Sequence, residues 1–146
     1  MRWLICCALA FGACKSDDNR EERWREQRAS IDAQWDRYRA AIDAFLDATA
    51  KKDYDRAYTM LAPTYRNMVP RDHFVAHVAQ NHNFDKPVAI AIGRSRSING
   101  AVTLDCSWGE LGNAEVTIVD TAEGSQTTLQ VAAISINGTP ALPAPP

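Results

Sequence analysis

Two histidines of this sequence have a spacing that could hold a metal ion. His73 and His77 are four residues apart and would share one face of a helix. A zinc site takes at least three protein ligands, however, and the segment HFVAH lacks the glutamate of a metalloprotease helix. We therefore interpret the pair as polar surface residues, and the sequence predicts neither a metal site nor a cofactor.

Tyrosines and carboxylates could perform acid–base catalysis if they met in an apolar pocket. The side chains of suitable type are Tyr58, Tyr65, Asp105 and Asp120. Asp105 alternates with apolar residues in a strand pattern and is expected to face solvent, whereas the tyrosines occupy positions typical of packing residues. No catalytic residue is predicted from this group.

One cysteine lies in the body of the chain. Cys106 shares a strand face with Leu104 and Trp108, and no histidine pattern accompanies it. A lone buried thiol is usually a small apolar side chain, so we interpret Cys106 as core rather than as a nucleophile.

The other three cysteines, Cys6, Cys7 and Cys14, lie close to the N-terminus. The apolar run from Trp3 to Ala13 is too short for a spanning helix, which needs about 20 residues, and it suits a secretory signal peptide. Small residues at positions 12 and 13 precede Cys14. This pattern resembles the lipobox of bacterial lipoproteins.

The lipobox resemblance implies cleavage before Cys14 and a diacylglycerol thioether on its sulfur. The mature protein would then be anchored to a bacterial membrane through lipid and face the periplasm. Lys15 stands where an aspartate would favour the inner membrane, so the outer membrane is favoured. The alternative is a plain signal peptide in which Cys14 has no role.

Composition excludes one class of partner and limits the number of domains. A chain of 146 residues with a formal charge of −2 suits one domain and lacks the basic excess of nucleic-acid-binding proteins. Residues 15–28 alternate in charge, which is typical of a solvated helix or tether. We expect a signal peptide at 1–13, a tether or helix extension at 14–29, a domain at 30–138 and a proline-rich tail at 139–146.

Hydrophobic periodicity predicts one long helix followed by two short ones. The long helix carries an apolar stripe with spacings of three and four: Ile31, Trp35, Tyr38, Ile42, Phe45 and Leu46. Asp53 is positioned to cap the second helix, which Pro63 would end. The third helix is expected from near Pro70 to about Gln80.

Beyond Asn83 the pattern changes to the alternation of β-strands. Gly93 would permit a bulge in the first strand, and Asn99-Gly100 is a strong signal for a two-residue hairpin. About four strands are expected, with the fourth bulging before Ile134. The fold class predicted is α+β, with the helices packed on a curved antiparallel sheet.

The segment from Ala41 to Phe74 resembles the opening of cone-shaped domains of the nuclear transport factor two, ketosteroid isomerase and SnoaL-like superfamily. The shared positions are Lys52, Asp53, Tyr54, Ala57, Tyr58, Leu61, Pro63, Tyr65 and Arg66. The resemblance implies a pocket between helices and sheet. Candidate pocket residues are Trp35, Tyr58, Tyr65 and Trp108.

Three functions are therefore open. The favoured one is a lipid-anchored envelope protein whose domain binds a partner protein or a small apolar ligand, with the membrane as its other partner. The alternative is a small-molecule enzyme of the isomerase or cyclase type. The third is a spacer or assembly module whose charged helix contacts a partner. A carboxylate and a hydroxyl converging in a closed cavity would favour the enzyme.

Overall fold

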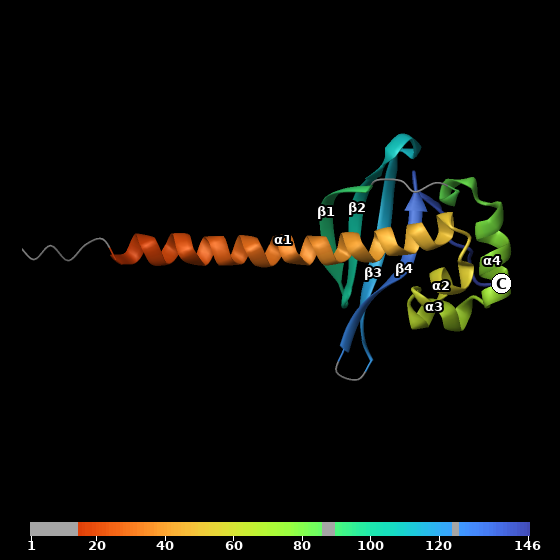
Figure 1. Cartoon of the computed structure of the whole chain (residues 1–146), viewed down its shortest axis with the longest axis horizontal. Helices are drawn as coiled ribbons and strands as arrows, with labels where there is room; N and C mark the ends of the chain where they lie inside the picture. Colours follow the sequence, from red (N-terminus) through yellow and green to blue (C-terminus); the bar gives the residue numbers. More distant parts are fainter. Residues whose placement is uncertain (1–14, 86–89, 124–125) are drawn as a thin grey trace, which may run out of the picture. The chain divides into compact units, whose positions relative to one another are not determined.

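The computed structural model describes residues 15–85, 90–123 and 126–146 (Figure 1). Helix α1, Lys15–Ala50, is continuous, but contacts divide the chain into two units, Met1–Gln34 and Trp35–Pro146. The two units are therefore considered separately. Cys14 and the proposed signal peptide lie outside the described residues.

The described part of the first unit is a charged helix. Its described side chains are exposed, including Trp24 at 58% and Ile31 at 46%. Arg25 and Glu21 form an exposed i,i+4 ion pair at 3.4 Å, a kind of pair that contributes little to stability. Within residues 15–85, 90–123 and 126–146, no helix is both long enough and apolar enough to cross a membrane.

The second unit begins with the C-terminal part of α1 and continues with short helices. These are α2 (Tyr54–Thr59), α3 (Pro63–Met68), α4 (Arg71–Gln80) and the 3-10 turn η1 (His82–Phe84). The predicted cap is confirmed, because the Asp53 side chain accepts a hydrogen bond from the Arg56 N–H at 3.2 Å. Helix α3 was not predicted: we expected two short helices and the described residues form three.

The missed helix has a simple cause. The sequence predicts that Pro63 ends a helix, but in the structure it also occupies the first turn of α3, where its missing N–H costs nothing. The same proline therefore separates two helices and begins the second of them.

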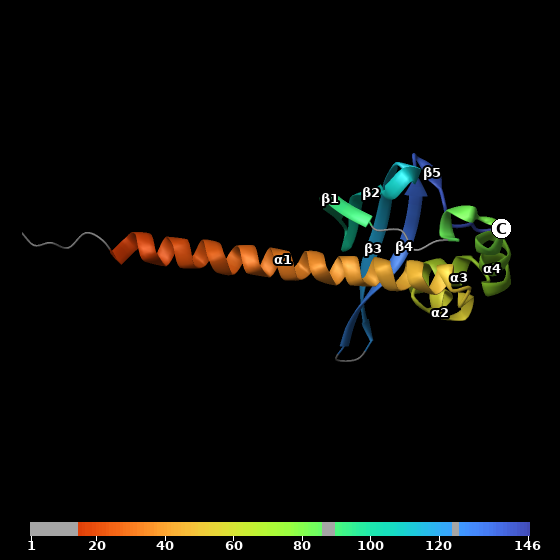
Figure 2. The same cartoon turned by 45° about the horizontal axis from the view of Figure 1, so that its top comes forward.

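The strands form one antiparallel sheet in chain order (Figures 1 and 2). They are β1 (Ile90–Ile98), β2 (Ala101–Trp108), β3 (Asn113–Glu123), β4 (Gln126–Ile136) and β5 (Thr139–Pro140), with a 3-10 turn, η2 (Gly109–Leu111), between β2 and β3. The α+β class with helices packed on an antiparallel sheet is confirmed. Five strands are described where about four were predicted, because the short β5 was assigned to the tail.

Two bulges interrupt the register. The first separates the pairs Ile92–Cys106 and Arg94–Asp105, as predicted from Gly93. The second lies in β4 between Val131 and Ala133, slightly earlier than predicted. Because of this shift Val131 and Ile134 are both buried while Ala133 is exposed.

The core fills the space between the helices and one face of the sheet. Its largest fully buried side chains come from every layer: Ile42, Phe45, Leu61, Phe74, Leu104, Trp108, Ile118 and Ile134. Of the stripe predicted on α1, the four residues from Tyr38 to Leu46 are buried, Trp35 is partly buried and Ile31 is exposed. Burial of this apolar surface supplies the main driving force for folding.

The proline-rich tail is docked against the domain. Its first two residues form β5, and the Ala141 N–H donates to the Ile134 carbonyl at 2.8 Å. Ala141 and Leu142 are buried, and the Tyr65 hydroxyl donates to the Pro143 carbonyl at 2.7 Å. Up to Pro143 the tail is therefore held by hydrogen bonds to the rest of the domain.

The two outer edges of the sheet differ in whether another segment of the chain pairs with them. On the outer edge of β4, the Ala62 N–H donates to the Val131 carbonyl at 2.8 Å and the Val131 N–H donates to the Met60 carbonyl at 3.0 Å. Strand β5 covers the same edge further along. Among the described residues, β1 pairs only with β2, so its outer edge is open.

Candidate binding surface

The hydroxyls of the two candidate pocket tyrosines are occupied by main-chain carbonyls. Tyr58 donates to Val69 at 2.8 Å, with the Arg66 carbonyl at 3.1 Å, and its ring lies 5.6 Å from that of Phe74. Tyr65 donates to Pro143, and burial raises the pKa of its phenol. Both tyrosines therefore tie segments of the domain together.

The two candidate pocket tryptophans differ in burial. Trp108 is fully buried and packs edge-to-face on Phe84, with ring centroids 6.0 Å apart. Its indole Nε1 is buried and has no hydrogen-bond partner among the described residues, a cost that the packing of the large ring must offset. Trp35 is partly buried at the edge of the core.

The other residues singled out for chemistry lie apart from one another. His77 and Asn81 both donate to the Ala141 carbonyl, at 3.2 Å each, and so hold the tail, whereas His73 is exposed. No group of three potential metal ligands occurs in the described part of the chain. Cys106 is buried, and burial, followed by the nearby charge of Asp105, raises the pKa of its thiol to about 11.

An open groove of about 880 Å³ lies on the face of the sheet opposite the core. Side chains from three strands line it: Ala91, Arg94, Arg96, Asp105, Ser107, Asn113 and Glu115. Alternation along the strands explains this composition, since the neighbouring Cys106 and Ala114 point to the core. The groove thus combines charged and polar side chains with apolar ones, Ala91 and Ile92 among them, and is contained within the second unit.

A charged cluster occupies the groove. The Arg96 guanidinium donates to Glu115 at 2.6 Å and to Asp105 at 3.2 Å, bridging three strands. These carboxylates, Glu115 first, raise the pKa of Arg96. Arg94 lies opposite Asp105 in the register but forms no ion pair with any described residue. Among the described residues, the groove therefore presents an unpaired Arg94 beside an Arg96 whose charge is more than balanced by two carboxylates.

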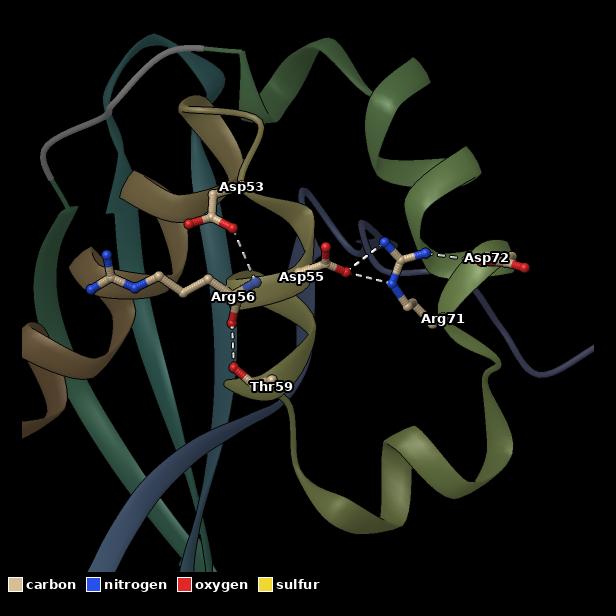
Figure 3. A network of polar contacts seen from close by, with 6 residues as sticks. All are labelled: Asp53, Asp55, Arg56, Thr59, Arg71 and Asp72. Atoms are coloured by element: carbon tan, nitrogen blue, oxygen red, sulfur yellow. Dashed lines mark hydrogen bonds and ion pairs between the residues drawn. The ribbon is translucent and has the colours of Figure 1, made fainter.

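A second polar network lies on the helices and is structural (Figure 3). Arg71 of α4 donates to Asp55 of α2 at 2.5 Å and to Asp72 at 3.0 Å. The hydrogen bond from Arg71, opposed only in part by desolvation, lowers the pKa of Asp55. All three side chains are largely exposed, so the network contributes little energy, but it joins α2 to α4.

Comparisons with protein-family models, with curated proteins and with solved structures find no match for this chain.

The sequence did not point to the groove residues as a set. Arg94, Arg96 and Glu115 come from separate strands, and only the register brings their side chains together. The available signal was the alternation itself: the four charged residues that line the groove all fall on the face opposite the buried residues of β1 to β3.

Proposed function

We propose that this protein is a lipid-anchored component of the bacterial cell envelope whose C-terminal domain binds a partner. The observation that carries the binding half is the contrast between its two sheet faces. The face toward the helices is filled by core side chains, whereas the other face carries an open groove with exposed charges. An arrangement of this kind suits recognition of a polar partner surface better than enclosure of a small apolar ligand.

The enzyme alternative has less support. Acid–base catalysis needs a carboxylate and a hydroxyl that converge in a water-excluded cavity. The hydroxyls of Tyr58 and Tyr65 donate to carbonyls within the domain, and the side chains of Asp105 and Asp120 lie at the surface. We therefore favour a binding function over an enzymatic one.

The anchor half of the proposal comes from the sequence around Cys14. In this proposal, the lipid on Cys14 comes directly before the charged helix of residues 15–34. At about 1.5 Å per residue this helix is roughly 30 Å long. Such a helix would act as a spacer between the membrane surface and the domain. The order of helices followed by a meander is consistent with a cone-shaped domain of the nuclear transport factor two type, which we propose as the family.

Replacement of Cys14 tests the anchor. Cys14→Ser should leave the protein unlabelled by radioactive fatty acid and move it out of the membrane fraction or leave the precursor uncleaved. Cys7→Ser is the matched control, since this residue lies in the proposed leader and should change neither result. Normal labelling and partitioning of Cys14→Ser would contradict the anchor.

Site-directed photo-crosslinking tests the binding surface in cells. A photoreactive amino acid in place of Ala91, an exposed residue of the groove, should give a discrete crosslinked species. The same amino acid in place of Thr64, exposed on α3, is the control. Identical crosslinking patterns at the two positions would refute the groove as the binding surface.

A further inference from the structure

The open edge of β1 is the least satisfied main-chain surface of the sheet. The opposite edge is closed by residues 60–62 and by β5, whereas β1 has β2 as its sole described neighbour. All side chains of residues 93–98 are exposed, so no described element shields this edge. An edge of this kind is a template for pairing with another chain.

The hairpin turn determines which groups point outward. Asn99 and Gly100 both have positive φ, 52° and 81°, and form a two-residue turn flanked by the pair Ile98–Ala101. That pair is hydrogen-bonded across the turn, and bonded pairs alternate with non-bonded pairs along an antiparallel ladder. The N–H and C=O groups of Ser95 and Ser97 therefore point away from β2, toward the open edge.

The bulge and the charges limit what can pair there. The bulge at Gly93 interrupts the first part of β1, which leaves residues 94–98 as the regular segment. Arg94 and Arg96 stand on the outer face of this segment, and their carboxylate neighbours, Asp105 and Glu115, belong to strands further from the edge. A strand added at this edge would meet two arginines first.

We propose that residues 94–98 bind an extended acidic segment of a partner protein, which adds to the sheet as a further strand beside β1. The segment's main chain pairs with Ser95 and Ser97, and an acidic side chain lies opposite Arg94. This inference rests on the proposed binding function and names the class of partner: a flexible acidic peptide segment that recognises main-chain groups.

A second copy of this chain fits the edge less well. Antiparallel pairing of two β1 strands about a twofold axis would place both pairs of arginines on one face, opposite or diagonal to each other. Like charges at such positions oppose pairing. On the inner face each copy would contribute only Ser95 and Ser97, and on the outer face Ile98, which is 67% exposed, is the one apolar side chain of the segment.

The test uses a synthetic peptide blocked at both ends, in which threonine and valine alternate around a central aspartate. Titrated at millimolar concentration into isotope-labelled full-length protein in detergent, it should shift the amide signals of Ser95 and Ser97 and slow their hydrogen exchange. Ser97→Pro removes one outward N–H at a position where an edge strand tolerates proline, and should weaken binding by about tenfold. Ser97→Ala keeps the N–H and should bind like the wild type.

Reversing the charge at Arg94 provides a second test, which does not depend on the proline substitution. Arg94→Glu, at an exposed site, should weaken binding of the aspartate peptide by about fivefold. It should strengthen binding of the same peptide with lysine at its centre. Unchanged amides at Ser95 and Ser97, equal binding by Ser97→Pro and Ser97→Ala in folded protein, or indifference to the charge exchange would overturn the proposal. A dimer in sedimentation that Ser97→Pro dissociates would assign the edge to a second copy and also overturn it.

The two proposals can fail separately. If crosslinking from Ala91 persists in the Ser97→Pro protein, the domain binds a partner and the strand-addition inference is wrong. If crosslinking from Ala91 matches that from Thr64 while the peptide still shifts Ser95 and Ser97, the edge binds strands and the groove assignment is wrong.

Discussion

Two Asn-Gly turns in this domain share a conformation but differ in side-chain bonding, which allows the contribution of one asparagine to be measured. Asn99 and Asn137 have φ of 52° and 50°. The Asn137 Oδ1 accepts from the Asn113 N–H at 3.1 Å, and its Nδ2 donates to the Leu111 carbonyl at 2.8 Å. No hydrogen bond of the Asn99 side chain is seen to any described residue. We predict that Asn137→Gly destabilises the domain and that Asn99→Gly does not.

The expected loss of stability follows from subtracting the effect of Asn99→Gly from that of Asn137→Gly. Glycine accepts positive φ readily, so both substitutions relieve the same backbone strain and add the same flexibility to the unfolded chain. Their difference isolates the two side-chain hydrogen bonds of Asn137. Each exposed neutral bond contributes about 0.5–1 kcal/mol, so Asn137→Gly should be less stable than Asn99→Gly by about 1–2 kcal/mol. The corresponding difference in Tm is about 4–8 °C for a domain of this size.

Urea denaturation followed by circular dichroism measures this difference directly. Alanine at the two positions extends the comparison, since Asn99→Ala should lose only the cost of positive φ, about 1–2 kcal/mol. Because a Cβ on Gly112 would lie 2.7 Å from the Asn137 Oδ1, Gly112→Ala should displace the same side chain. Gly112 also has a φ of 97°, so alanine there adds a backbone strain of its own; combined with Asn137→Gly, Gly112→Ala should lose the part of its cost that comes from displacing Asn137 and keep the cost of the strain. Equal stabilities of Asn137→Gly and Asn99→Gly would refute the assigned role of Asn137.

Two further predictions concern the buried hydroxyls and the thiol. Tyr58→Phe and Tyr65→Phe should each fold, lose about 1 kcal/mol in urea denaturation and keep partner crosslinking from Ala91; a stable Tyr58→Phe protein that lost crosslinking would instead assign its hydroxyl to binding. Because the pKa of Cys106 is raised to about 11 in the folded state, the folded protein holds the thiol proton more tightly than the unfolded chain does. The free energy of unfolding should therefore fall as the pH rises from about 9 to 11, and Cys106→Ala should show a smaller fall; equal pH profiles would contradict this.

Local patterns in the sequence were sufficient for much of the fold. The apolar stripe of α1, the Asp53 cap, the bulge at Gly93 and the Asn99-Gly100 turn all depend on neighbours within a few residues, and each was predicted. The same Asn-Gly signal occurs at Asn137-Gly138, where no turn was predicted. Its positive φ angles of 50° and 79° form the turn into β5, which could have been predicted by applying the rule consistently.

Features that depend on contacts between distant residues could not be read in this way. Docking of the tail depends on Tyr65 and His77, which are 78 and 64 residues from their acceptors. The groove depends on the register of three strands, and the open edge of β1 depends on which segments happen to cover β4. Tyr58 was predicted to be a packing residue, but its hydroxyl also binds the carbonyl of Val69 at the end of α3, a helix that was not predicted.

Closure of the β4 edge has a consequence for how the domain folds. The consecutive hairpins of β1 to β4 join sequence neighbours, so their loop-closure entropy is small and they can form early. The bridge between Leu61 and Val131 and the bonds to Ala141 and Pro143 close far longer loops and require the helices to be in place. Until then the meander has two unprotected edges, and aggregation during refolding should depend on the rate of that late closure.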